Sequence, residues 1–170
     1  PAPASGSGST DAKALVVYFS WSGNTENVAE SIQRQTGADI FEILPAVPYS
    51  DDYDTVVDLA REEQRNNARP AISGGIENIE QYDIIYVGFP NWWGDMPMAI
   101  YSFLDEYDLS GKTIVPFVTS GGSGFSGSVE EIEDAEPDAE VLEGLSLSDS
   151  EATDAQSDIE EWLGELGYLG

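Results

Sequence analysis

Two residue types that carry much of enzyme chemistry are missing from this sequence, which has no cysteine and no histidine. Without cysteine there is no disulfide framework and no thiol nucleophile, and without both residues the usual structural zinc sites are excluded. A Ser-His-Asp triad and histidine acid–base catalysis are excluded as well. A bound cofactor is therefore expected to carry any difficult chemistry, and we expect no catalytic side chain and no metal site.

Positive charge is scarce, since six Lys and Arg residues face 33 Asp and Glu residues and the formal net charge is -27. Such a surface repels phosphate backbones, so nucleic acid is excluded as a partner. It attracts partner proteins with basic surfaces and speeds their encounter at low salt. Solubility, or adaptation to high salt, explains the same charge equally well.

Long apolar runs are also lacking, and none approaches the eighteen residues that a membrane-spanning helix needs. Apolar residues nevertheless make up 41% of the 170 residues, which is enough for one packed domain, expected over residues 13–170. Residues 1–12 are rich in Pro, Ala, Ser and Gly, a composition typical of a flexible linker. A linker of this kind often follows a removed export signal. It favours an extracytoplasmic or surface-tethered protein, and a cytoplasmic location stays open.

The rest of the chain alternates between apolar strand patterns and helical periodicity. Strands are predicted at residues 14–20, 39–44, 83–89, 113–119 and, more weakly, 140–147, and helices at 24–36, 53–67, 97–107, 126–135 and 154–166. Strands that are apolar throughout indicate a parallel sheet with helices on both faces, a three-layer α/β fold. Two strand orders dominate among such folds, and both bind ligands at the carboxyl ends of the strands.

The loop after the first strand reads Ser20-Trp21-Ser22-Gly23-Asn24-Thr25 and runs into a helix. Hydroxyl groups, a glycine and the unpaired N–H groups of a helix N-terminus together favour an anion. The loop has no Lys or Arg, so it suits a phosphate monoester held by neutral hydrogen bonds rather than an ATP P-loop. The alternative is an ordinary helix cap with Ser22 or Asn24 as the N-cap residue.

Two further loops follow the third and fourth strands. The first, Pro90-Asn91-Trp92-Trp93-Gly94, holds two adjacent Trp residues, and one ring can offer a flat face to a planar heteroaromatic ligand. The second, Ser120-Gly121-Gly122-Ser123-Gly124, allows a ligand to approach the backbone closely. The alternatives are Trp rings that cap the sheet edge and a flexible glycine turn.

These segments resemble the flavodoxin-like family, and in particular its short-chain bacterial members. The resemblance lies in YFSWSGNTENVA, GFPNWWGDMP and GKTIVPFVTSGGSGFSGS and extends over about residues 13–166. It implies a five-stranded parallel sheet of order 2-1-3-4-5, non-covalently bound FMN and electron transfer. Flavodoxin is itself the reference case for FMN at the switch point of such a sheet, so that placement comes with the resemblance.

The resemblance also implies which residues bind FMN. Ser20, Ser22, Asn24 and Thr25 are expected to hold the phosphate, together with backbone N–H groups from Trp21 to Thr25. The ring is expected between two loops, with Trp92 or Trp93 against one face. The expected cofactor-binding residues are Ser20, Trp21, Ser22, Gly23, Asn24, Thr25, Pro90, Asn91, Trp92, Trp93, Gly94, Ser120, Gly121, Gly122, Ser123 and Gly124.

Other functions remain open at this point. An NAD(P)H-dependent quinone or flavin reductase could use the same fold and FMN, and a non-redox binding module could use the acidic face. Gly122 to Gly127 matches GxGxxG, but too little chain follows for the dinucleotide unit that this pattern marks. The acidic run at residues 51–54 fits no standard calcium loop, and an acidic solvent-facing turn explains it better.

Overall fold

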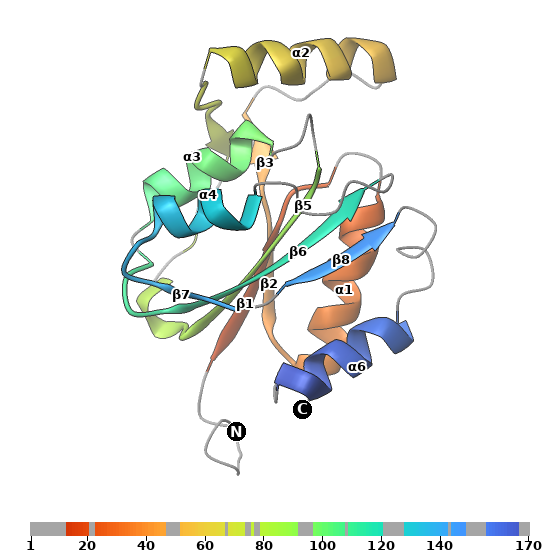
Figure 1. Ribbon diagram of the computed structural model, residues 1–170, viewed down its shortest axis with the longest axis vertical. Helices are drawn as coiled ribbons and strands as arrows, with labels where there is room; N and C mark the ends of the chain where they lie inside the picture. The colour runs from red at the N-terminus through yellow and green to blue at the C-terminus, as the bar shows by residue number, and fades with distance from the viewer. Residues whose placement is uncertain are drawn as a thin grey trace.

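A computed structural model describes residues 13–20, 23–46, 52–66, 68–73, 76, 79–91, 97–107, 109–120, 128–142, 144–148 and 156–166. It shows a central sheet between two layers of helices (Figure 1). The predicted linker at residues 1–12 lies outside the described residues. No helix in the described part of the chain is long and apolar enough to cross a membrane.

The main sheet is parallel and has the strand order β2-β1-β5-β6-β7, with β8 also paired to β6. Its strands are β1 (Ala14–Tyr18), β2 (Asp39–Glu42), β5 (Ile84–Pro90), β6 (Thr113–Ser120), β7 (Glu140–Val141) and β8 (Leu145–Ser148). The predicted fold class and order are confirmed, with β7 and β8 together in the fifth position. The expected fifth strand is interrupted between residues 141 and 145, in the segment that contains Gly144.

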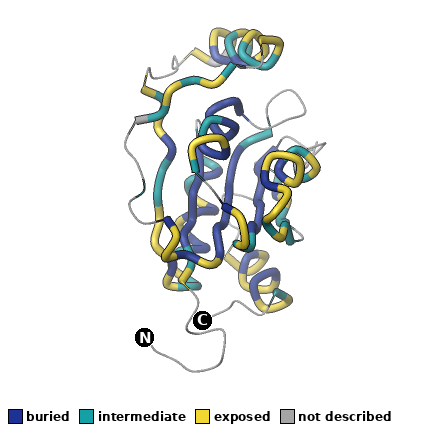
Figure 2. Tube along the Cα trace, turned by 90° about the vertical axis from the view of Figure 1, so that its left-hand side faces the viewer, coloured by how far each residue is buried: buried dark blue, intermediate teal, exposed yellow. Residues whose placement is uncertain are grey.

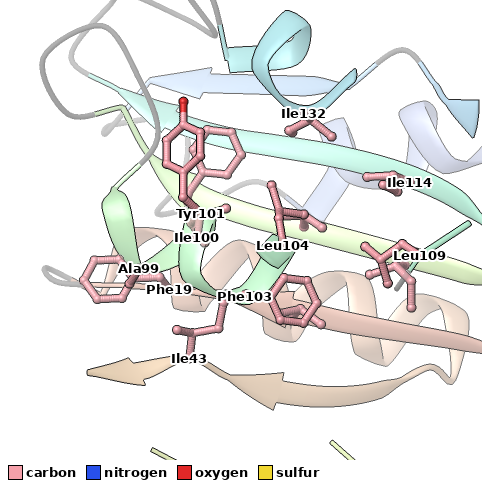
Figure 3. Packing of buried hydrophobic residues seen from close by; sticks show 14 of the residues in the cluster. Phe19, Ile43, Ala99, Ile100, Tyr101, Phe103, Leu104, Leu109, Ile114 and Ile132 are labelled. Atoms are coloured by element: carbon pink, nitrogen blue, oxygen red, sulfur yellow. The ribbon is translucent and has the colours of Figure 1, made fainter. Parts of the chain in front are cut away.

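Two apolar clusters form on opposite faces of the sheet because strand side chains alternate between its faces. Helix α3 (Met98–Glu106) and helix α4 (Ser128–Ala135) pack on one face, where Phe103, Leu104 and Ile132 are buried (Figure 3). Helix α1 (Asn24–Thr36) and helix α6 (Gln156–Leu166) cover the other face. The core therefore consists of two halves, each built by a different pair of helices.

A smaller element stands apart from this arrangement. Strands β3 (Leu44–Pro45) and β4 (Ile72–Ser73) form an antiparallel pair that the sequence did not predict. Between them lies helix α2 (Tyr53–Arg65), at the top of the molecule in Figures 1 and 2. A short 3₁₀ turn, η2 (Ile79–Gln81), then leads into β5.

Helix α1 agrees with its prediction at both ends, since it spans residues 24–36 and its C-cap is Gly37, with a φ of 75°. Helix α2 ends two residues earlier than predicted, and α3 is one residue shorter at each end. The predicted starts of α4 and α6, at residues 126–127 and 154–155, lie outside the described residues. The differences in α2 and α3 arise at caps, where propensity gives little information about the last turn. Helix α3, for example, begins at Met98 because Pro97 is its N-cap rather than its first helical residue.

Candidate functional site

Three strand ends meet at one edge of the sheet. In the parallel register Tyr18 of β1 lies opposite Gly88 of β5, and Pro90 of β5 lies opposite Thr119 of β6. The strands therefore finish side by side, toward the same side of the molecule (Figure 1). The loops that follow them all start from this edge, as the sequence predicted.

The structure describes some of the expected FMN-binding residues and not others. Those described are Ser20, Gly23, Asn24, Thr25, Pro90, Asn91 and Ser120. Those outside the described residues are Trp21, Ser22, Trp92, Trp93, Gly94, Gly121, Gly122, Ser123 and Gly124. The geometry of the site is therefore built from the strand ends and from the first turn of α1.

Gly23 forms the turn between β1 and α1. It is the N-cap residue of α1 in a left-handed conformation, with φ 99° and ψ -11°, which favours glycine strongly. Its N–H donates to the Ser20 side-chain oxygen Oγ at 3.1 Å, and its carbonyl accepts the first helical bond from Asn27 at 3.0 Å. Ser20 therefore shapes the turn through a side-chain hydrogen bond.

In the described part of the chain, the N-terminus of α1 has no side-chain cap, because its N-cap residue is a glycine. Gly23 is the N-cap residue, so the alternative with Asn24 at that position is wrong, and Ser22 lies outside the described residues. The first N–H groups of a helix have no partner within it, and the helix dipole places partial positive charge there. Nothing described lies within 4 Å of the position that a Cβ would take at Gly23. This end of the helix therefore fits a phosphate group.

A buried hydrogen bond joins this helix end to β6. The side-chain hydroxyls of Thr25 and Thr119 are 2.8 Å apart, and the two residues are only 1% and 2% exposed. Thr119 also accepts a backbone hydrogen bond from the N–H of Asn91 at 2.9 Å, just past the end of β5. Thr119 therefore contacts the stems of two of the three loops and lies at the start of the third. Thr119 is not among the binding residues predicted from the sequence.

Ser120 follows Thr119 as the last residue of β6 and is also buried. It lies opposite Ser148 of β8 in the parallel register. Pro90 and Asn91 are half-buried at the end of β5. These residues bring the stems of the second and third loops next to each other.

Acidic side chains gather beside the first turn of α1. The Tyr18 hydroxyl donates to Glu26 Oε2 at 3.4 Å, and Glu42 lies opposite Tyr18 in the parallel register. Burial, and then the nearby Glu26 and Glu30 carboxylates, raise the pKa of Glu42 above its usual value. The pKa of the Tyr18 hydroxyl is raised by burial and then by the nearby Glu42, Glu26 and Glu30 carboxylates.

This negative charge has two consequences for the site. It opposes a bound anion, so backbone N–H groups and hydroxyls must supply the attraction. It does not form a metal centre, because no group of three or more acidic side chains in the described part of the chain is arranged to hold a metal ion.

Comparison with known proteins places this geometry in a family. A family model described as flavodoxin matches residues 13–166. A Bacteroides eggerthii protein described as a flavoprotein is 35% identical in its crystal structure, with a TM-score of 0.81 over 91% of this chain and 98% of that one. The crystal structure of a Lactobacillus acidophilus flavoprotein in complex with FMN is 27% identical, with a TM-score of 0.70 over 86% of this chain and 99% of that one.

Curated sequences agree over a shorter stretch. Flavodoxin 1 of Escherichia coli (strain K12) is 28% identical over 110 residues, which are 60% of this chain and 46% of that protein. The chain thus spans about half the length of the curated relatives it matches. The family model, however, covers nearly the whole chain. The chain therefore belongs to the flavodoxin family.

Proposed function

We propose that this protein binds FMN non-covalently at the carboxyl edge of its sheet and carries electrons between partner proteins. The observation that carries the proposal is the N-terminus of α1, where the N-cap residue is a left-handed glycine, Gly23, which has no side chain to cap the first N–H groups. A flavoprotein with a TM-score of 0.70 to this chain is solved in complex with FMN, which supports the same cofactor here. The expected binding residues are the sixteen predicted from the sequence, in and beside the loops that follow β1, β5 and β6.

When bound, FMN supplies the electron transfer, and the chain supplies binding and orientation. The first turn of α1, with Ser20, Asn24 and Thr25, holds the phosphate by neutral hydrogen bonds and the helix dipole. The stems at Pro90, Asn91 and Ser120 set where the two ring-binding loops begin. Trp92 or Trp93 is proposed to cover a ring face and to exclude water from it.

The partners proposed for this carrier are redox proteins with basic surfaces. A net charge of -27 favours fast encounter with such surfaces at low ionic strength. It also disfavours nucleic acid as a partner. Electron-transfer rates with a basic partner should therefore fall steeply as salt is added.

The first test is a titration of the purified protein with FMN, followed by the visible spectrum and by flavin fluorescence. We expect bound FMN with quenched fluorescence. Colourless protein after soaking at high micromolar FMN would reject the proposal and favour a non-redox binding module.

A matched pair of variants tests the site itself. Gly23 and Gly37 flank α1, both in the left-handed conformation, and nothing described lies within 4 Å of a Cβ at either position. Gly23→Ala and Gly37→Ala should therefore each lose about 1–2 kcal/mol of folding free energy to backbone strain. Only Gly23→Ala should weaken FMN binding. Equal effects of the two variants on FMN affinity would exclude this helix end as the phosphate site.

A second candidate is an NAD(P)H-dependent reductase on the same fold. The chain is 31% identical to an NAD(P)H dehydrogenase (quinone) of Acidovorax ebreus over 99 residues, 55% of this chain and 46% of that protein. Adding NADPH alone to the FMN-loaded protein separates the two functions. Rapid bleaching of the flavin supports a reductase, and a stable yellow colour supports a carrier.

A further inference from the structure

The hydroxyl pair of Thr25 and Thr119 is unusual in its position. The two residues are 94 positions apart in the chain, on different elements, and both are almost fully buried. Thr25 is the second residue of α1, inside the turn whose N–H groups face the proposed phosphate. Thr119 lies on the neighbouring β6, one residue before its end.

A bound anion would determine which of the two threonine hydroxyls donates to the other. Each hydroxyl has one proton to donate and lone pairs that accept, and either threonine can be the donor in the 2.8 Å contact. A phosphate dianion accepts only. If Thr25 donates to the phosphate, the proton between the two hydroxyls must therefore come from Thr119.

The carbonyl of Thr119 adds a second connection. It accepts the N–H of Asn91 at 2.9 Å, and Asn91 is the first residue after β5. One residue therefore fixes the first turn of α1 through its side chain and the start of the β5–α3 loop through its backbone. The phosphate and ring ends of the proposed site share this support.

We propose that Thr119 is a positioning residue for the phosphate of the cofactor. It holds the Thr25 side chain in one rotamer and leaves the Thr25 proton available to the anion. This inference rests on the proposed function, because it requires that FMN binds at this edge. It adds a residue that does not itself contact the cofactor to the determinants of its affinity.

The test compares Thr119→Val with Thr119→Ser in the full chain. Valine keeps the shape of the side chain but removes the hydroxyl, whereas serine keeps the hydroxyl. Thr113→Val is the matched control, because Thr113 lies at the opposite end of the same strand. Dissociation constants are measured for FMN and for riboflavin, which has the ring but no phosphate.

We expect Thr119→Val to weaken FMN binding about fivefold, which corresponds to the loss of one ordinary hydrogen bond. Riboflavin affinity should stay unchanged, and Thr119→Ser and Thr113→Val should bind FMN like the wild type. Unchanged FMN affinity in Thr119→Val would overturn the inference. So would an equal loss of FMN and riboflavin affinity, since that indicates a general structural role.

Two more measurements guard against a variant that fails to fold and against failure of the proposed function. In the double variant Thr25→Val/Thr119→Val no hydroxyl is left unpaired, and its FMN affinity should be no lower than that of Thr25→Val alone. In the ligand-free protein, amide hydrogen exchange of Asn27, whose N–H donates to the Gly23 carbonyl at the start of α1, should speed up in Thr119→Val but not in Thr113→Val. If the wild type itself binds no FMN, the proposed function fails and the inference falls with it. If the wild type binds FMN and exchange is unchanged, only the inference fails.

Discussion

Replacing Gly88 with alanine is the substitution whose effect on stability the structure defines most sharply. Gly88 lies in β5, directly opposite Phe117 of β6 in the parallel register. A Cβ at Gly88 would stand 2.1 Å from the ring atoms Cε2 and Cζ of Phe117. Carbon atoms in contact prefer about 3.5–4.0 Å, so the ring must retreat by about 1.5 Å. Phe117 is only 1% exposed and cannot turn into solvent.

The expected loss of folding free energy in Gly88→Ala is the difference between two opposing contributions. Overpacking a dense core costs typically about 1–3 kcal/mol, and a contact this short belongs at the upper end. Alanine is favoured over glycine within a strand by about 0.5–1 kcal/mol. The net loss should be about 2 kcal/mol, or about 4–8 °C in the melting temperature of a domain of this size.

Urea unfolding followed by circular dichroism measures this loss. Gly164→Ala is the control, because Gly164 is an exposed residue of α6 and nothing described lies within 4 Å of its Cβ position. That variant should gain about 0.5–1 kcal/mol. Phe117→Leu should make room for the alanine side chain. The loss of folding free energy in the double variant Gly88→Ala/Phe117→Leu should therefore be smaller than the sum of the losses in the two single variants. A Gly88→Ala variant within about 0.5 kcal/mol of the wild type would refute the reasoning.

Further predictions concern charge. Because the folded-state pKa of Glu42 is raised, its contribution favours the folded state at low pH and is lost as pH rises through that pKa. Glu42→Gln should therefore raise the melting temperature at neutral pH, with a gain that shrinks toward about pH 4. The exposed Glu133→Gln serves as control, and a lower melting temperature of Glu42→Gln at neutral pH would contradict the prediction. Salt should also stabilise the protein, since the Debye length falls from about 10 Å at 0.1 M to about 3 Å at 1 M and screens the repulsion within a chain of net charge -27. Thermal unfolding at both salt concentrations measures this, and a melting temperature that falls with salt would contradict it.

The sequence predicts the regular elements well where periodicity is strong. The buried strands β1 and β5 are apolar throughout, β6 is apolar between Thr113 and Thr119, and α1 ends at the glycine cap that its sequence suggests. The two-residue strands β3 and β4 are too short to show any period. Their pairing depends on the backbone path around α2, which a local pattern does not encode.

The candidate site also has features that the sequence predicts and features that it does not. A glycine within a helix N-terminal loop indicates an anion site, and the structure shows Gly23 as an N-cap without a side chain. Nothing local indicates that Thr119 faces Thr25, since Thr119 stands at the end of an apolar strand and the two are 94 residues apart. The need for glycine at position 88 cannot be predicted from the local sequence either, because only the pairing of β5 with β6 places it against Phe117.

The division of the core into two halves has a consequence for synthesis of the chain. Helix α1 carries Val28, Ala29 and Ile32, and α6 covers the same face of the sheet. Gln35 in α1 donates to the carbonyl of Gln156 in α6, 121 residues later. At the translation rate of about 5–20 residues per second, α6 is synthesised about 6–24 seconds after α1. The apolar face that these two helices share stays uncovered by α6 for that time. The face packed by α3 and α4 is complete sooner. During synthesis, the half of the core under α1 and α6 therefore stays exposed after the half under α3 and α4 can pack.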